Sequence, residues 1–412
     1  MGKVMRSLRG AVAAAWMLTL ISCGGGDGSS SGAASGSTSP ATAAPNVASV
    51  IVDGGPTASS PSINTLFTSV TLCVPGSTTQ CQTIDHIQVD TGSYGLRVLA
   101  PVLALSLPLT KASDGSALVE CTQFVDGYSW GPVALADVQV SGETAASVPI
   151  QVIGDTNFVT VPNDCSSPNP NAEDTVATFG ANGILGIGVF EQDCAGCDSN
   201  AANGFYYSCP QTGDCLGTTV PIADQVANPV PLFATDNNGT IIDLPSVAAP
   251  GEATMTGSLI FGIDTRTNNA SGTQSVLTVD GNGNFTIVFN GQTFNASFID
   301  SGTNGIFFSD SALPTCTESS FSGFYCPSST QNFSATLTGL NAVSVTEAFS
   351  VENAENVASG NPTYTVLPAL GGTYSNSADT FDWGLPFYYG RRVATAIENH
   401  TTAVNTGPYI AF

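Results

Sequence analysis

The sequence is poor in basic residues, and this shortage narrows the possible partners. Its 412 residues include 8 Lys and Arg against 32 Asp and Glu, giving a formal net charge of −24 at pH 7. A surface of this sign repels nucleic acid and anionic lipid headgroups, so we expect no nucleic-acid partner. The same composition is compatible with an acidic environment, where protonation relieves the repulsion between carboxylates.

Histidine is almost absent, and this excludes several kinds of catalysis. The chain contains only His86 and His400. A Ser-His-Asp triad needs a His beside a nucleophilic Ser, and no G-x-S-x-G motif lies between an expected strand and helix. The sequence also lacks the H-E-x-x-H zinc motif and the G-x-x-x-x-G-K phosphate loop. Carboxylate chemistry remains, and we predict neither a metal nor a cofactor.

Long helical periodicity is missing beyond the N-terminal segment. The chain is 42% hydrophobic and has 44 Gly and 24 Pro. Together with abundant Thr, Ser and Val, this composition is typical of many short strands joined by turns. We therefore predict an all-β protein, and 412 residues are enough for two lobes that each bury a core.

The N-terminus has the features of an export signal. A basic start, "MGKVMRSLRG", precedes the apolar run "AVAAAWMLTLI", which is too short to span a membrane as a helix. The following "SC" resembles a bacterial lipobox, so we predict a signal peptide at 1–22 and lipidation at Cys23. Residues 23–46 then read as a flexible Gly/Ser/Ala/Thr tether. These features predict a lipid-anchored protein of the bacterial cell envelope, on the periplasmic or surface side of the outer membrane.

Ten further cysteines follow Cys23, and an even number in an exported chain predicts five disulfides. Cys73 and Cys81 are close enough in sequence to staple one loop, and Cys316 and Cys326 another. Cys194, Cys197, Cys209 and Cys215 could bind zinc, but an oxidising compartment favours two disulfides. The sequence does not determine how these cysteines pair.

Two similar turns carry the candidate chemistry. "IQVDTGSYGL" at 87–96 and "FIDSGTNGIF" at 298–307 each lead an apolar run into Asp, a hydroxyl residue, Gly and a second hydroxyl residue. Gly92 and Gly302 lack a Cβ, so the two turns can approach closely. Two carboxyls about 3 Å apart share one proton, and one can then activate a water while the other acts as an acid. We predict that Asp90 and Asp300 form such a dyad. Each turn alone would more often be an ordinary strand end.

The chain resembles the pepsin-like, two-lobed aspartic peptidases over most of residues 47–412. "ANGILGIG" follows the first turn and "FDWGLPFYYG" the second, and each resembles the family's strand that supports a catalytic loop. The segment "TQFVDGYSWG" resembles the family's flap hairpin. Arg97 stands where the family has an aromatic residue, and Asp382 where it has an apolar one.

The resemblance implies a bilobal fold, with an N-terminal lobe at 47–235 and a C-terminal lobe at 236–412. It also implies an aspartic endopeptidase that acts as a monomer on a peptide or protein substrate. The alternatives are a non-catalytic peptide- or ligand-binding lipoprotein and a peptidase restricted to itself or to one envelope partner. The implied site residues are the catalytic Asp90 and Asp300, the dyad-supporting Thr91, Gly92, Ser93, Ser301, Gly302 and Thr303, the strand glycines Gly186 and Gly384, and the flap residues Phe124, Gly127 and Tyr128.

Overall fold

The computed structural model describes residues 44–57, 61–374 and 377–412. The predicted signal peptide, Cys23 and the tether up to residue 43 lie outside this part of the chain. Within it, the chain forms 22 strands, with only three short α-helices and six 3-10 turns, which confirms the prediction of an all-β protein. No helix of the described residues is long and apolar enough to cross a membrane.

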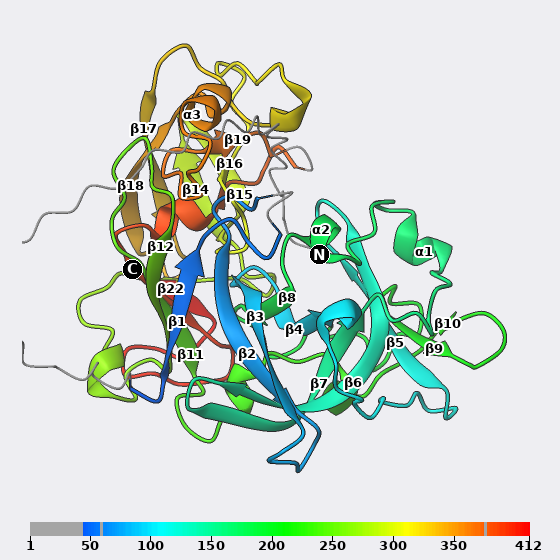
Figure 1. The fold of residues 1–412 in the computed structure, drawn as a ribbon. Helices are drawn as coiled ribbons and strands as arrows, with labels where there is room; N and C mark the ends of the chain where they lie inside the picture. Colours follow the sequence, from blue (N-terminus) through cyan, green and yellow to red (C-terminus); the bar gives the residue numbers. More distant parts are fainter. Residues whose placement is uncertain (1–43, 58–60, 375–376) are drawn as a thin grey trace, which may run out of the picture.

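The larger sheet contains fifteen strands and curls on itself, because β2 pairs with β6 as well as with β1 and β3 (Figure 1). Strand β1 pairs with β12, so strands from both sides of residue 235 belong to this one sheet. In spatial order the strands are β10 (Leu216–Gly217), β9 (Tyr206–Cys209), β5 (Ala117–Gln123), β6 (Tyr128–Val140), β7 (Glu143–Ile153), β4 (Tyr94–Leu99), β8 (Gly183–Ile187), β3 (Cys81–Asp90), β2 (Leu66–Cys73), β1 (Val47–Val52), β12 (Met255–Phe261), β11 (Gly239–Asp243), β21 (Arg392–Ala396), β22 (Tyr409–Ala411) and β13 (Val276–Thr278).

The smaller sheet has seven strands, all from the later part of the chain. Figure 1 shows it at the upper left, in yellow to orange, away from the cyan strands β5, β6 and β7. Its strands are β18 (Ser344–Val351), β17 (Gln331–Thr338), β14 (Phe285–Phe289), β15 (Gln292–Ile299), β20 (Asp382–Trp383), β16 (Ile306–Phe307) and β19 (Gly371–Gly372). The short helices are α1 (Asn163–Ser166), α2 (Val176–Phe179), α3 (Ala354–Gly360) and the 3-10 turns η1 (Ala100–Val102), η2 (Ile222–Asp224), η3 (Val230–Leu232), η4 (Thr267–Asn269), η5 (Ser319–Phe321) and η6 (Leu385–Tyr388).

Aromatic side chains fill the core beneath the smaller sheet. The rings of Phe308 and Phe381 stack with centroids 4.8 Å apart, and Trp383 packs on Phe381 at 4.9 Å. Each such pair contributes about 0.5–1.5 kcal/mol beyond the burial of its area. Alternation along β20 places Trp383 in this core and turns its neighbour Asp382 towards the opposite face of the strand.

Five disulfides join all ten cysteines of the described residues, which confirms the predicted number and the expectation that Cys194, Cys197, Cys209 and Cys215 form two disulfides. They link Cys73 to Cys81, Cys121 to Cys165, Cys194 to Cys197, Cys209 to Cys215 and Cys316 to Cys326. Disulfides persist in oxidising compartments, so the structure indicates an extracellular or periplasmic environment.

Candidate active site

Asp90 is the last residue of β3 and Asp300 directly follows β15, and each of these strands belongs to a similar three-strand unit. In the first unit, β8 lies between β3, to which it is parallel, and β4, to which it is antiparallel. In the second unit, β20 lies in the same way between β15 and β16. Asp90 pairs with Gly186, and the backbone N–H of Asp300 donates to the carbonyl of Trp383 at 2.9 Å. The two turns are therefore held by equivalent backbone frames.

The two carboxylates have matching hydrogen-bond partners. Asp90 Oδ1 accepts from the N–H of Gly92 at 2.6 Å, and its Oδ2 accepts from the hydroxyl of Ser93. Asp300 Oδ1 accepts from the N–H of Gly302 at 2.8 Å, and its Oδ2 lies 3.1 Å from the hydroxyl of Thr303. Asp90 is 2% and Asp300 1% exposed.

The glycines of the two turns allow the carboxyls to face each other. A Cβ on Gly92 would lie 2.2 Å from the Cγ of Asp300, and a Cβ on Gly302 would lie 2.5 Å from Oδ1 of Asp90. The same point on Gly302 is 3.2 Å from Oδ1 of Asp300. Both Oδ1 atoms therefore lie close to the same point at Gly302, and only glycine fits at these two positions.

Side chains of each turn also hold the backbone of the other turn. The N–H of Thr91 donates to Oγ of Ser301 at 3.1 Å, and the N–H of Ser301 donates to Oγ1 of Thr91 at 3.0 Å. Gln88 adds a third link, donating from Nε2 to the carbonyl of Gly302 at 3.0 Å. The first two links are formed by residues that the sequence singled out, whereas Gln88 was missed, because nothing in its local pattern distinguishes it from any strand residue.

Gly186 and Gly384, the predicted supporting glycines, lie against the turns. A Cβ on Gly186 would approach the backbone N of Tyr94 to 2.7 Å, and one on Gly384 would approach the carbonyl of Thr303 to 2.4 Å. The buried hydroxyl of Tyr388 then joins Thr91 Oγ1 at 2.8 Å. Burial raises the pKa of Tyr388 well above its usual value, and the nearby charges of Asp300, Asp90 and Asp382 raise it further.

A cavity of about 580 Å³ is lined by residues from both sides of residue 235. Tyr94, next to Ser93, contributes to one wall, and Phe298, two residues before Asp300, to another. The turn between β5 and β6 contributes Val125 to the lining of this cavity. Its next residue, Asp126, lines a second cavity of about 710 Å³.

A family model described as "Protein of unknown function (DUF3443)" matches residues 42–412. The chain belongs to this family. No curated protein matches it.

In this DUF3443 protein, the predicted flap segment is a hairpin, but its aromatic rings pack into the core. Phe124 N–H donates to the carbonyl of Gly127 at 2.7 Å, which closes the turn. The Phe124 ring lies edge-on to Phe179, with centroids 6.1 Å apart, and Tyr128 packs with Trp130 in another cluster. The sequence located the turn but did not show that its flanking rings point away from the cavity.

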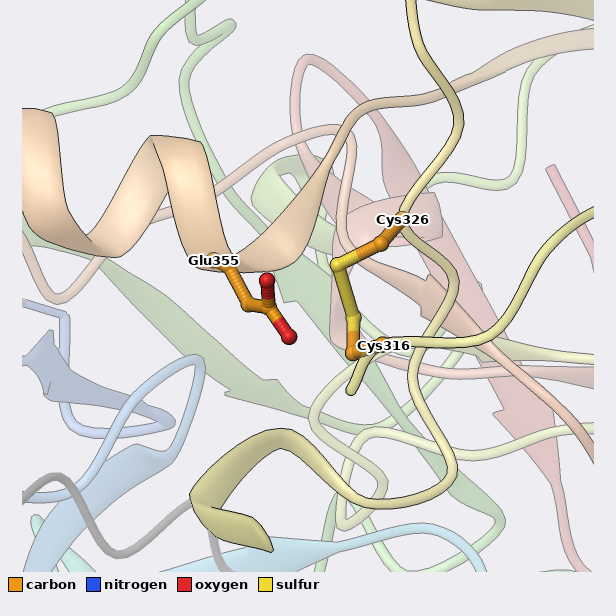
Figure 2. Close-up of side chains that lie close together, drawn as sticks. All are labelled: Cys316, Cys326 and Glu355. Carbon is orange, nitrogen blue, oxygen red and sulfur yellow. A yellow bond between two sulfur atoms is a disulfide. The ribbon is translucent and has the colours of Figure 1, made fainter. Parts of the chain in front are cut away.

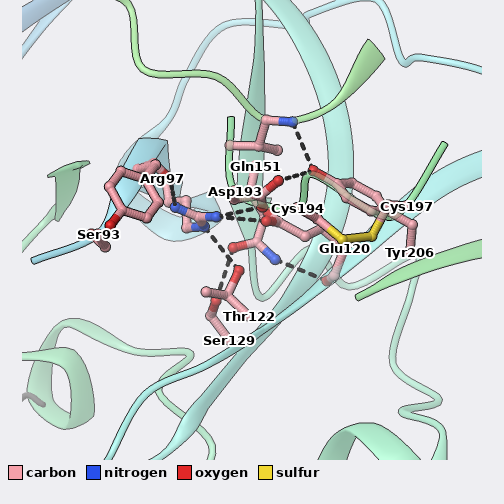
Figure 3. A network of polar contacts seen from close by, with 12 residues as sticks. Ser93, Arg97, Glu120, Thr122, Ser129, Gln151, Asp193, Cys194, Cys197 and Tyr206 are labelled. Carbon is pink, nitrogen blue, oxygen red and sulfur yellow. Dashed lines mark hydrogen bonds and ion pairs between the residues drawn. A yellow bond between two sulfur atoms is a disulfide. The ribbon is translucent and has the colours of Figure 1, made fainter. Parts of the chain in front are cut away.

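Arg97 is the centre of a buried polar network that joins three parts of the DUF3443 chain (Figure 3). Its guanidinium pairs with Glu120 of β5 at 2.6 Å and with Asp193 at 2.9 Å, and it donates to the carbonyl of Tyr94 at 2.6 Å. Arg97 also donates to Thr122 of the hairpin at 2.9 Å. One side chain therefore connects the turn after Asp90, the base of the hairpin and the loop closed by the 194–197 disulfide.

The network contains one guanidinium and two carboxyls, and this imbalance raises the pKa values of Arg97 and Asp193. Burial alone would lower the pKa of Arg97, but Glu120 and Asp193 raise it above its usual value. Burial and the charge of Glu120 raise the pKa of Asp193 well above its usual value, despite Arg97. Tyr206 donates to Asp193 at 2.7 Å. One guanidinium therefore faces two buried carboxyls, and the repulsion between the carboxyls adds to burial in raising the pKa of Asp193.

Cys316, Cys326 and Glu355 form the cluster that most resembles a metal site in the described residues, but their bonds are already made (Figure 2). The two cysteines are joined in a disulfide. Glu355 Oε1 accepts from the N–H groups of Thr317 and Glu318 at 2.7 and 2.8 Å. Disulfide sulfurs are not thiolate ligands, so this cluster is structural.

Proposed function

We propose that this protein is an aspartic endopeptidase of pepsin-like, bilobal fold. The observation that carries the proposal is the facing pair of Asp-[Thr/Ser]-Gly turns, each in the same three-strand unit and each held by the side chains of the other. Such paired carboxyls are suited to general acid and base catalysis.

In the proposed mechanism, one carboxylate of Asp90 and Asp300 removes a proton from a water between them. The water attacks the peptide carbonyl while the other carboxyl donates to the carbonyl oxygen. Collapse of the tetrahedral intermediate then breaks the C–N bond. The leaving amine takes the proton that the first carboxylate removed from the water, and the hydroxyl formed from the carbonyl returns its proton to the second carboxylate as the product acid forms. The two cavities that border the 124–127 turn would hold parts of the peptide.

A second candidate is a binding protein that keeps the dyad without using it. The near-complete burial of Asp90 and Asp300 favours this alternative, because a substrate must reach both carboxyls. Under either function, we propose that Cys23 carries a lipid anchor and that the tether separates the folded part from the membrane of the cell envelope.

Cleavage by dyad variants separates the two candidates. A soluble form starting at residue 24 should cleave an unfolded protein at acidic pH, and a pepstatin-type inhibitor should block it. Asp90→Asn and Asp300→Asn should each lower kcat by at least about 10²-fold, the range expected for loss of acid–base catalysis. Asp379→Asn, an exposed carboxyl, is the matched control and should retain activity. Full activity in either dyad variant would disprove the assignment, and no cleavage between about pH 3 and 7 would favour the binding protein.

A further inference from the structure

The two halves of the site differ at one buried position. On β8, Gly186 is preceded by Ile184 and Leu185, whereas Gly384 directly follows the two residues of β20, Asp382 and Trp383. Ile184 packs in a hydrophobic cluster, as expected for a side chain without solvent exposure. Asp382 is equally inaccessible, with 0% exposure. A carboxyl at such a position needs hydrogen bonds, and burial disfavours its charge.

Thr303 connects Asp382 to the dyad. The Thr303 hydroxyl oxygen lies 3.0 Å from Oδ2 of Asp382 and 3.1 Å from Oδ2 of Asp300. A hydroxyl has one hydrogen and can donate to only one of two carboxylates. Both contacts are hydrogen bonds only if one carboxyl is protonated and donates to Thr303. The equivalent Ser93 in the first half donates to Asp90, and β8 offers it no second carboxyl.

We propose that Asp382 is a third carboxyl of the site, a positioning residue that acts through Thr303 to retain one proton on the chain Asp300–Thr303–Asp382. In one arrangement Asp382 donates to Thr303, and Thr303 donates to an ionised Asp300. Shifting each hydrogen by one place gives the reverse arrangement, in which Asp300 carries the proton and Asp382 the charge. Both arrangements contain the same atoms and the same single proton.

The surroundings of the Asp300–Thr303–Asp382 hydrogen-bond chain are anionic. Asp90, across the two turns, and the phenol of Tyr388 are titratable groups that face it, and the charges of all three carboxyls raise the pKa of Tyr388. The four arginines of the described residues pair with carboxylates elsewhere: Arg97 with Glu120 and Asp193, Arg266 with Asp236 and Glu143, Arg391 with Glu347, and Arg392 with Asp243. A retained proton therefore relieves the charge repulsion among the carboxyls.

The hydrogen-bond chain Asp300–Thr303–Asp382 makes the two carboxyls of the dyad inequivalent. Asp300 can exchange charge with Asp382 through the Thr303 hydroxyl, whereas the Ser93 hydroxyl that donates to Asp90 meets no carboxyl of β8. A use of this difference in catalysis rests on the proposed function, whereas the proton chain itself rests only on the geometry.

The difference between the numbers of protons bound by the folded and the unfolded protein tests the proton chain without any cleavage assay. In an Asp90→Asn background, which removes the dyad's own shared proton, the pH dependence of the unfolding free energy is compared with and without Asp382→Asn. Near pH 5 to 7 the folded Asp90→Asn protein should bind about one proton more than the unfolded protein, and we expect Asp382→Asn to abolish this difference. Asn can still donate to Thr303, so the substitution keeps this hydrogen bond, and Asp379→Asn in the same background should change nothing. Equal proton retention with and without Asp382→Asn overturns the proposal.

A second variant approaches the chain from its other end. Asp300→Asn in the same Asp90→Asn background also leaves Thr303 with a neutral donor and should lose the same proton. If Asp382→Asn does not fold, this variant decides the question, and undiminished retention overturns the chain.

Peptide cleavage by otherwise wild-type protein gives an independent result. Asp382→Asn should shift the pH profile of kcat/KM, while Asp379→Asn should not. If the dyad variants abolish cleavage but Asp382→Asn changes neither the profile nor the proton count, the proposal fails and the peptidase assignment stands.

Discussion

Replacing Thr91 with valine tests whether the two turns hold each other. Valine has nearly the same shape, but it removes the oxygen that accepts from the N–H of Ser301 at 3.0 Å and that joins the hydroxyl of Tyr388 at 2.8 Å. Both groups are fully buried. Each buried donor left without a partner costs about 1–3 kcal/mol, so two cost about 2–6 kcal/mol. The whole free energy of unfolding of a typical protein is about 5–15 kcal/mol.

Chemical denaturation measures this loss as a lower midpoint at an unchanged slope. The matched control is Thr71→Val, because Thr71 shares a 2.7 Å hydroxyl contact with Thr83 on an exposed surface, where water can replace it. We expect a change below about 0.5 kcal/mol for the control. Thr91→Ser keeps the oxygen and should retain most of the stability. A Thr91→Val variant as stable as Thr71→Val would show that the links between the turns contribute little.

Two further predictions concern stability. Burial and Glu120 hold the pKa of Asp193 well above its usual value, so the stability that Asp193 contributes is fully present below its unfolded pKa of about 4. This contribution is lost as pH rises towards the folded pKa, by at most about 1.4 kcal/mol per pH unit. Asp193→Asn should flatten this decline in urea unfolding between pH 4 and 7, and a decline as steep as in the wild type would refute it. Removing the Cys121–Cys165 disulfide, which spans 44 residues, should lower stability by about 3–4 kcal/mol, and removing that of Cys73, which spans 8, by less. The reverse order in calorimetry would contradict this explanation.

The features that the sequence predicted well are those that depend on residues close together in the chain. Asp90 and Asp300 each follow a short apolar run and precede a hydroxyl residue and glycine, and this spacing alone predicts a strand that ends in a tight turn. Strand propensity and abundant turn residues likewise indicated an all-β chain. That the turns meet could be expected from their similarity, but the hydroxyl-to-backbone links between them required the structure.

The features that sequence did not provide depend on partners far apart in the chain. Arg97 appeared only as a departure from an aromatic position, because Glu120 and Asp193, 23 and 96 residues away, come from different elements. Asp382 appeared as a polar residue where an apolar one was expected, and its contact with Thr303 spans 79 residues. Phe124 was placed correctly in a turn, but the direction of its ring depends on Phe179 in α2.

The contact of each glycine turn with the other turn's Asp also has a consequence for how the protein is made. The turns are 210 residues apart, and a ribosome completes the Asp90 turn long before it reaches Ser301. Until then the first turn has neither the facing carboxyl nor the hydroxyl that its backbone N–H requires. A nascent or truncated chain therefore contains no finished centre, and any activity of the dyad is delayed until synthesis and folding of the second turn are complete.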